Sequence, residues 1–203
     1  RRLAEEGAKV TVTDVNVEAG QAVAEELGGD ALFVQQDVRQ EADWQRLMDT
    51  VADRHGRLDI LHNNVGISIA GNDAEITEIT VEAFDHCVAV NLRGMVLTCK
   101  HALPSMREQG SGAIINISSL AAWSVYPLVA YKTTKAAVVA MTEQLAIMNA
   151  SYGIRANVIL PGLMDTPMAV DTRAKTLGKS RADVAAMRDA QVPLGKKMGT
   201  AWD

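Results

Sequence analysis

The sequence predicts a single α/β domain built on a three-layer, doubly wound parallel sheet with helices on both faces. Short segments rich in β-branched and other apolar residues alternate with helical segments along most of the chain. Parallel neighbours need crossover connections, and right-handed crossovers place the helices on the faces of the sheet. With 203 residues, 48% of them hydrophobic, the chain is large enough to bury one substantial core. We therefore expect one domain over residues 1–203.

Each expected strand is short, apolar and followed by a turn or a polar residue. The five strands are expected over residues 8–13, 31–36, 58–62, 112–117 and 154–160. The fourth is apolar almost throughout, as a parallel strand buried on both faces should be.

The helical segments are recognised by their apolar periodicity. They are expected over residues 1–6, 17–27, 41–54, 81–109 and 129–152. Gly7 and Gly153 follow two of them as typical C-terminal residues, and Pro104 predicts a disturbance inside the long fourth helix. Residues 163–203 are expected to be helical in parts and to contain no strand.

Composition and charge narrow the class of function. A formal net charge of -5 argues against nucleic acid or an anionic membrane as partner. No apolar run reaches the length of a membrane-spanning helix and no signal peptide opens the sequence, so the cytoplasm is expected. Cys87 and Cys99 are expected to be free buried thiols. No metal site is expected, because the four histidines lack the spacing of metal ligands.

Polar residues follow the expected strands. In doubly wound sheets, ligands bind beyond the carboxyl ends of the strands. The sequence therefore predicts a ligand site at this edge, formed by Asp14, Asp37, Asn63, Ser118, Ser119 and the Pro161-Gly162 turn.

Tyr131 and Lys135 are a candidate proton-transfer pair. A spacing of four residues on the expected helix places the phenol and the ammonium on one face, one turn apart. At roughly 5 Å and an effective dielectric of about 20, the lysine charge contributes about 3 kcal/mol, which would lower the tyrosine pKa by roughly two units. A surface helix with a chance aromatic and base explains the pair equally well when it is taken alone.

Asp14 ends the first expected strand. This is where a doubly wound nucleotide-binding fold places the acid that hydrogen-bonds the adenosine ribose. No arginine occurs in the next three residues, so the position favours NAD over NADP. A turn or helix-capping role for Asp14 is the alternative.

Five motifs follow one another along the chain. They are Asn63-Asn64-Val65-Gly66, Asn91, Asn116-Ile117-Ser118-Ser119, Tyr131 with Lys135, and Pro161-Gly162-Leu163-Met164-Asp165-Thr166. Any one of them is weak, but five in this order are a specific signal. Taken together, they resemble the short-chain dehydrogenase/reductase family over nearly the whole chain.

The resemblance implies an NAD(P)-dependent oxidoreductase acting on CH–OH groups, with four catalytic residues. Ser119 would hydrogen-bond the substrate oxygen and Tyr131 would pass it the proton. Lys135 would lower the tyrosine pKa and bind the nicotinamide ribose. Asn91 would interrupt its helix and hold a water that links Lys135 to solvent. Ser118 is the alternative to Ser119 as the active serine.

The resemblance also implies the cofactor contacts. Asp37 and Val38 would contact the adenine, and Thr166 the nicotinamide amide. The other implied cofactor positions are Asn63, Val65, Gly66, Pro161 and Gly162, together with Asp14, Tyr131 and Lys135. Lys132 departs from the family pattern and would add a charge that shifts the pKa of Tyr131 further.

The segment 163–192 corresponds to the family's substrate lid. Its apolar residues fit a substrate of some hydrophobic bulk, or simply pack on the sheet; they are Met164, Met168, Leu177 and Met187. Its basic residues fit an anionic substrate, or a solvated helix face; they are Arg173, Lys175, Lys179, Arg181 and Arg188.

The family pattern includes a first strand with a glycine-rich loop and a last strand, neither of which the sequence contains. That first strand would lie between the strands ending at Asp14 and His62, so both neighbours should expose unpaired edges and the chain should be insoluble or inactive.

The resemblance thus implies hydride transfer between NAD(H) and a secondary alcohol or ketone. It also implies a homodimer or homotetramer packed through helices 81–109 and 129–152. A non-catalytic nucleotide-binding or scaffold protein and an NAD-bound isomerase or dehydratase are the alternatives.

Overall fold

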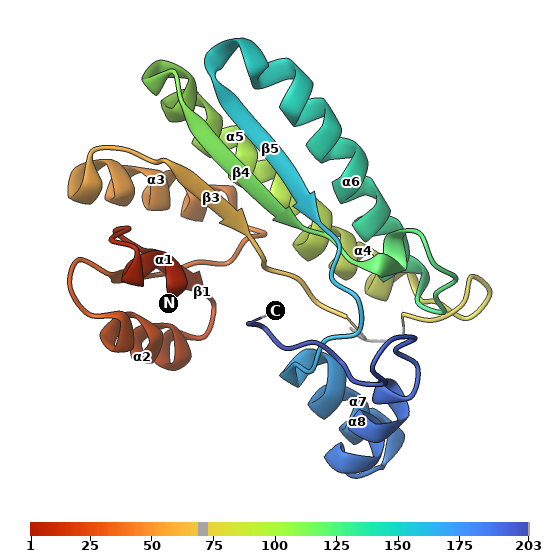
Figure 1. Ribbon diagram of the computed structural model, residues 1–203. Coiled ribbons are helices and arrows are strands. Elements are labelled where there is room, and N and C mark those ends of the chain that lie inside the picture. The colour runs from red at the N-terminus through yellow and green to blue at the C-terminus, as the bar shows by residue number, and fades with distance from the viewer. Residues whose placement is uncertain (69–72, 203) are drawn as a thin grey trace.

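The structure, a computed structural model, describes residues 1–68 and 73–202 (Figure 1). Its described strands are β1 (Thr11–Asp14), β2 (Leu32–Gln35), β3 (Ile60–Asn63), β4 (Gly112–Ile117) and β5 (Ile154–Ile159). Its α-helices are α1 (Arg2–Glu5), α2 (Val17–Leu27), α3 (Glu41–His55), α4 (Val81–Val88), α5 (Gly94–Gln109), α6 (Val129–Asn149), α7 (Thr172–Leu177) and α8 (Arg181–Asp189). Shorter turns are η1 (Ala89–Arg93), η2 (Leu120–Ala122), η3 (Ala150–Tyr152) and η4 (Pro167–Asp171).

All strand pairs are parallel, which confirms the predicted α/β class. The strands form two ladders, β1–β2 and β3–β4–β5. In the second ladder Asn63 lies opposite Asn116, which in turn lies opposite Val158. β1 and β3 are not paired with each other among the described residues, so each presents an open edge, as predicted.

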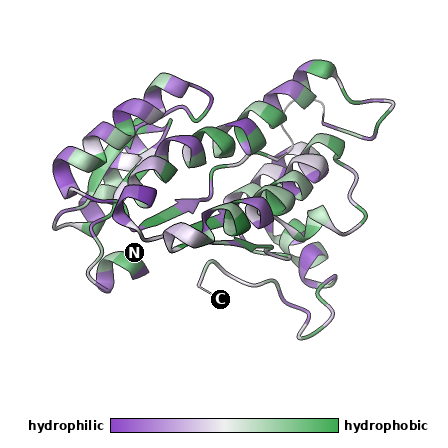
Figure 2. Ribbon diagram, turned by 90° about the horizontal axis from the view of Figure 1, so that it is seen from above, coloured by the Kyte–Doolittle hydropathy of each residue, from purple (hydrophilic) through white to green (hydrophobic). Residues whose placement is uncertain are grey.

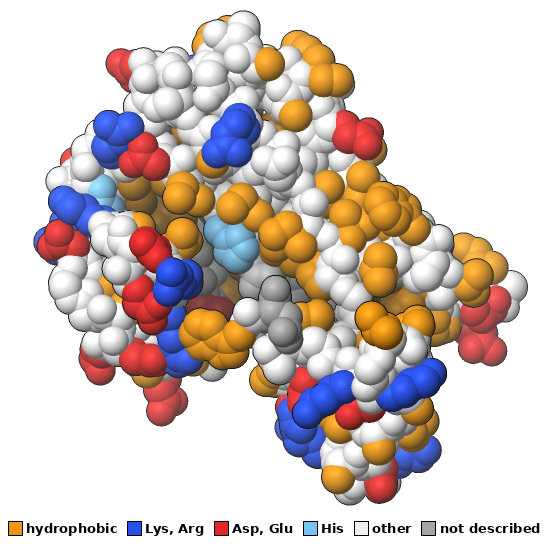
Figure 3. Space-filling model, in the orientation of Figure 1, with side chains coloured by type: hydrophobic (Ala, Val, Ile, Leu, Met, Phe, Trp, Pro, Cys, Tyr) orange, Lys and Arg blue, Asp and Glu red, His pale blue; other side chains and the backbone are white. Residues whose placement is uncertain are grey.

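Helices cover only one face of the β3–β4–β5 sheet, whereas both were expected to be covered. On the covered face, Ile114 and Ile154 pack with residues of α5, and Leu145 of α6 joins them. The register places Ile60 and Ile159 on the other face, where they are 40% and 50% exposed. Figure 3 shows hydrophobic side chains gathered around a histidine on the surface seen in that view. No described helix packs on this face to bury them.

The long helix is disturbed around Asn91, as the family resemblance implied, and not at Pro104. A π-helical turn, η1, separates α4 from α5, while α5 continues through Pro104. Pro104 is exposed, so water can satisfy the carbonyl whose helical partner the proline removes. The π-turn contains Asn91, which was expected to interrupt this helix.

The helices carry both hydrophilic and hydrophobic residues (Figure 2), and the apolar residues of α3 pack into the core. Trp44, Leu47 and Val51 of α3 pack with Val38, which follows β2, and with Val90 of η1. The indole Nε1 of Trp44 donates to the carbonyl of Val38 at 3.0 Å. This contact links the region after β2 to the helical layer, so the two ladders are held by a shared core and not by a shared edge.

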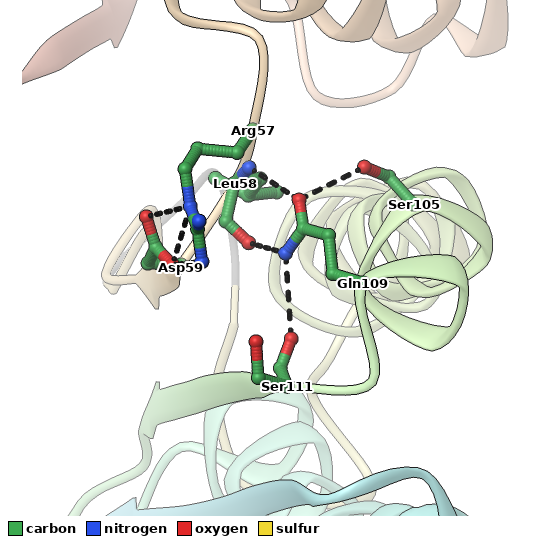
Figure 4. Close-up of polar contacts among 6 residues, drawn as sticks. All are labelled: Arg57, Leu58, Asp59, Ser105, Gln109 and Ser111. Carbon is green, nitrogen blue, oxygen red and sulfur yellow. Dashed lines mark hydrogen bonds and ion pairs between the residues drawn. The ribbon is translucent and has the colours of Figure 1, made fainter.

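Gln109 ties the end of α5 to the start of β3 (Figure 4). Its amide nitrogen donates to the Leu58 carbonyl at 2.9 Å, and its amide oxygen accepts from the Leu58 N–H at 2.9 Å. A second contact reaches the Ser111 carbonyl at 3.4 Å. One side chain thus satisfies the backbone that leads into β3 and the backbone that leads into β4, which supports the register of the two strands.

Replacing Gln109 by alanine should lower the free energy of unfolding by about 1–3 kcal/mol, because it leaves a part-buried donor and acceptor of Leu58 unpaired. Urea denaturation measures the change. Ser105→Ala is the matched control, since the exposed Ser105 hydroxyl only touches the Gln109 oxygen at 3.4 Å. Equal, small losses in both variants would contradict the role assigned to Gln109.

Candidate active site

The predicted site residues meet where the parallel strands end. In Figure 1 the arrowheads of β4 and β5 point toward η2, the start of α6 and the segment that carries α7 and α8. Asp14 ends β1 and Asn63 ends β3, while Ser118 directly follows β4. The structure therefore assembles the predicted residues at one edge, from segments far apart in the chain.

Tyr131 and Lys135 are neighbours on the first turns of α6. The Lys135 Nζ lies 5.8 Å from the centre of the Tyr131 ring. The lysine is almost fully buried, with 4% of its surface exposed, and its Nζ donates to the Ile117 carbonyl at 2.9 Å. The predicted adjacency is confirmed, and the alternative of a solvated surface pair is wrong.

The predicted lowering of the tyrosine pKa is not observed. Burial raises the pKa of the Tyr131 phenol above its usual 10.0, while the Ser119 side chain and the charge of Arg173 act in the opposite direction. Burial also lowers the pKa of Lys135 from 10.5 to about 8. Desolvation therefore disfavours the charged form of both groups. The charge of Lys135 is not a cause of the Tyr131 pKa shift.

The two consecutive serines have different surroundings. The buried Ser118 hydroxyl donates to the Lys135 carbonyl at 2.7 Å, which ties β4 to α6. The half-buried Ser119 hydroxyl accepts from the Ala121 N–H at 3.1 Å and lowers the pKa of the nearby Tyr131 phenol. Ser118 is engaged inside the fold, whereas the Ser119 hydroxyl lies beside the phenol. This placement favours Ser119 as the serine that meets a substrate oxygen.

Asn91 is fully buried in the π-turn and clips the loop after β3. Its amide donates to the Ile67 carbonyl at 2.9 Å and accepts from the Ile67 N–H at 2.8 Å. The extra residue of a π-turn rotates this side chain toward the loop. The Asn91 side chain does not face solvent, and the predicted water relay stays a prediction.

Gly66 lies against the side chains of Lys135 and Asn91. A Cβ at this position would lie 3.3 Å from the Lys135 Nζ and 3.4 Å from the Asn91 Oδ1. A side chain here would crowd the ammonium and the amide, so the absence of one allows the loop to pass close to them. The neighbouring Val65 is 42% exposed and extends this surface.

Asn63 faces the interior, where it begins a buried polar chain. Its amide donates to Asn116 at 2.9 Å, and Asn116 donates to the Thr142 hydroxyl of α6 at 2.9 Å. Thr142 continues the chain to the Val138 carbonyl at 2.7 Å. The Asn63 side chain is therefore committed to joining β3, β4 and α6.

Near the first ladder, the predicted adenosine-binding residues are engaged to different degrees. Asp14 is exposed, and one carboxylate oxygen accepts from the Asn16 N–H at 2.8 Å, in a local turn of the kind weighed as an alternative. Asp37 forms an ion pair with Arg39 at 2.6 Å. The hydrogen bond from the Arg39 side chain is the main cause that lowers the pKa of Asp37. The Val38 side chain is buried in the core.

The residues after β5 form a turn beside the serines. The Leu120 N–H donates to the Pro161 carbonyl at 3.0 Å, and a Cβ on Gly162 would lie 3.2 Å from the Leu120 side chain. Thr166 caps η4 by accepting from the Ala169 N–H at 3.2 Å. The turn thus joins the site to the lid segment.

Two functional contacts were not anticipated from the sequence. Asp73 is buried and accepts from the N–H groups of Ala130 at 2.9 Å and Tyr131 at 3.0 Å, which caps α6 from a distant segment. Lys132 donates to the Ser124 carbonyl at 2.5 Å and the Ala121 carbonyl at 3.0 Å. Lys132 therefore braces the loop between Ser119 and Tyr131, and its charge is not a cause of the Tyr131 pKa shift.

The described residues contain no cluster of three or more side chains able to hold a metal ion. Across the same part of the chain, no helix is both long and apolar enough to cross a bilayer. Cys87 and Cys99 are free and buried, as predicted.

Comparison with known proteins decides the family. Residues 1–177 match the short chain dehydrogenase family. The chain belongs to this family. The dehydrogenase LinX of Sphingobium indicum, which acts on 2,5-dichloro-2,5-cyclohexadiene-1,4-diol by its name, is 36% identical over 202 residues, covering 97% of this chain and 76% of LinX.

Solved short-chain dehydrogenases share the fold. Levodione reductase superposes with a TM-score of 0.90 at 33% identity, covering 98% of this chain and 79% of its own. An NAD+-bound xylitol dehydrogenase superposes with a TM-score of 0.86 at 31% identity, covering 98% of this chain and 80% of its own. ElxO, bound to NADP, superposes with a TM-score of 0.84 at 27% identity, covering 98% of this chain and 79% of its own. Both cofactors occur among the similar structures, so the fold alone does not select one.

Asp73→Ala should destabilise this short-chain dehydrogenase by about 1–2 kcal/mol, because two backbone N–H groups at the start of α6 lose their acceptor. Denaturant titration measures the loss. Asp73→Asn, which retains an acceptor oxygen, should recover part of it. A change within about 0.5 kcal/mol for the alanine variant would contradict the capping role.

The Lys135 shift predicts a pH-dependent stability. Between about pH 8 and 10.5 the unfolded chain carries a proton on this lysine that the folded chain has released, so this group raises the free energy of unfolding as pH rises through that window. Relative to Lys135→Met, the free energy of unfolding of the wild type should rise by up to about 3 kcal/mol from pH 8 to 10.5, as measured by urea denaturation at each pH. A difference that does not change with pH would contradict the shift.

Proposed function

We propose that this protein transfers hydride between NAD(H) and a secondary alcohol or ketone, with Tyr131 as the general acid and base. The observation that carries the proposal is the buried Lys135 Nζ, 5.8 Å from the centre of the Tyr131 ring, with the Ser119 hydroxyl close enough to the phenol to lower its pKa. These three side chains come from the end of β4 and the start of α6, at the edge where doubly wound folds bind ligands.

Each residue has a separate task in this proposal. NAD, when bound, supplies the hydride acceptor, or the donor in the reverse direction. The Ser119 hydroxyl hydrogen-bonds the substrate oxygen, and the Tyr131 phenol delivers a proton to that oxygen or removes one from it. Lys135 places an ammonium close to the phenol. The same ammonium offers a hydrogen-bond donor to the ribose hydroxyls. Asn91 positions the loop at Ile67 so that Gly66 passes beside Lys135.

The raised Tyr131 pKa favours carbonyl reduction at neutral pH. A phenol that stays protonated is prepared to donate, whereas alcohol oxidation needs the ionised form. Oxidation should therefore gain rate as pH rises.

The residues present fit a dinucleotide. An exposed carboxylate ends β1, and an exposed Val65 and a side-chain-free Gly66 follow β3. Asp14 would hold the adenosine ribose and repel a 2′-phosphate, which supports NAD over NADP. Asp37 and Val38 would lie at the adenine, and Asn63, Pro161, Gly162 and Thr166 along the rest of the cofactor.

The proposed partners are a small alcohol or carbonyl compound and further copies of this chain. Exposed apolar residues on α4, α5 and α6, such as Val81, Val96 and Ile147, support a dimer or tetramer through the long helices. Two free buried thiols and the acidic net charge fit a cytoplasmic protein.

The experiment that tests the proposal follows absorbance of the reduced nicotinamide over a panel of secondary alcohols and ketones. Tyr131→Phe should lower kcat by about 10²- to 10⁴-fold, the range supplied by general acid–base catalysis. Tyr152→Phe is the matched control, because Tyr152 is exposed and packs under Arg107 away from the site.

Equal turnover by wild type and Tyr131→Phe would refute the assigned mechanism. Saturable NAD binding without turnover on the whole panel would support the non-catalytic alternative. Rearrangement or dehydration of a substrate with no net change in NADH would support the isomerase or dehydratase.

A further inference from the structure

Two half-buried arginines of the lid lie near Tyr126, whose ring packs on that of the candidate catalytic Tyr131. Arg173 of α7 donates to the Tyr126 hydroxyl at 2.7 Å and to the Ala169 carbonyl at 3.2 Å. The Tyr126 ring packs on the Tyr131 ring, with 5.5 Å between their centres. A guanidinium, a phenol and the candidate acid–base group thus form one continuous contact.

Arg188 of α8 adds a second positive charge to this region. Its Nε contacts only the thioether sulfur of Met198, at 3.3 Å, which is a weak acceptor for a guanidinium. The pKa of Arg188 is lowered first by burial and then by the nearby charge of Arg173. Like charges held together in a partly desolvated place destabilise each other unless an anion joins them.

Neither arginine forms an ion pair with a carboxylate in residues 1–68 and 73–202. The exposed Arg181 of the same lid differs, because it pairs with Asp165 at 2.5 Å and with Asp171 at 3.1 Å. Asp165 and Asp171 thus pair with Arg181. The charge of Asp165 also acts on Arg188, but at a distance beyond that of an ion pair.

We propose that Arg173 and Arg188, with the Tyr126 hydroxyl, form a subsite that binds the carboxylate of a hydroxy acid or oxo acid substrate. The inference rests on the proposed function, since the alcohol or ketone oxygen of the same molecule would lie at Ser119 and Tyr131. The substrate class is thereby narrowed to compounds that carry a carboxylate apart from the reacting carbon.

The donor set suits a carboxylate. A guanidinium presents parallel N–H groups that match the two oxygens of a carboxylate, and such charge-assisted bonds are about twice as strong as neutral ones. The Tyr126 hydroxyl accepts from Arg173, so its own hydrogen remains to be donated to an anion. A carboxylate in contact with both arginines would offset their repulsion as well as fill the hydrogen bonds.

The test compares oxo acids, such as 4-oxopentanoate, with their neutral primary amides, such as 4-oxopentanamide. Wild-type protein should reduce the acid with the higher kcat/KM, mainly through a lower KM. Arg173→Gln and Arg188→Gln should each cut the acid-to-amide ratio of kcat/KM by about 10- to 100-fold, the range of a lost charged hydrogen bond. Because Arg173 also lowers the Tyr131 pKa, any effect on proton transfer is shared by both substrates and cancels in the ratio.

Lys175→Gln is the matched control, since it removes one positive charge from an exposed position of the same helix and should leave the ratio unchanged. An acid-to-amide ratio near one in the wild type, or an equal fall in all three variants, would overturn the inference.

A binding measurement separates this inference from the proposed function. With oxidised NAD present, the oxo acid should raise the melting temperature of the wild type more than the amide does, and should lose that advantage in Arg173→Gln and Arg188→Gln. This binding result without any turnover would support the carboxylate subsite and contradict the proposed reaction. Turnover of the neutral ketones, without any advantage for the acids in turnover or binding, would support the proposed reaction and contradict the subsite.

Discussion

Reciprocal hydrogen bonds between β4 and α6 hold the candidate active site together. The Lys135 ammonium donates to the Ile117 carbonyl at the end of β4, and the Ser118 hydroxyl donates back to the Lys135 carbonyl. The Ser118 contact is buried and the Lys135 contact is part-buried, so an unpaired polar group at either place would be costly. They set the distance between strand and helix, and so place Ser119 and Tyr131 opposite each other.

Buried polar groups extend this constraint through the sheet. Asn63, Asn116 and Thr142 link two strands to α6, while Asn91 links the π-turn to the loop at Ile67. Each side chain finds partners, so the network specifies a particular packing in addition to stabilising it. Within the described residues, the Gln36 amide is an exception, because it is buried after β2 without a hydrogen-bond partner.

The lid has its own small core and a different electrostatic character. Val170, Ala174, Val184 and Met198 pack together, which holds α7 and α8 beside the turn after β5. Met168, Leu177 and Met187 remain largely exposed, so they do not pack on the sheet. The lid therefore presents adaptable apolar surface outside and the Arg173 guanidinium toward Tyr126.

The sequence by itself determined the order and type of the elements, because alternating apolar periodicity, glycine stops and strand-end polar residues are local signals. It also determined that Tyr131 and Lys135 would be neighbours, since four residues make one helical turn. Tertiary structure decided the pKa direction of Tyr131, the cap supplied by Asp73, the different roles of Ser118 and Ser119, and the open face of the β3–β4–β5 sheet. These properties depend on burial and on contacts between distant segments, and no spacing along one helix or strand contains that information.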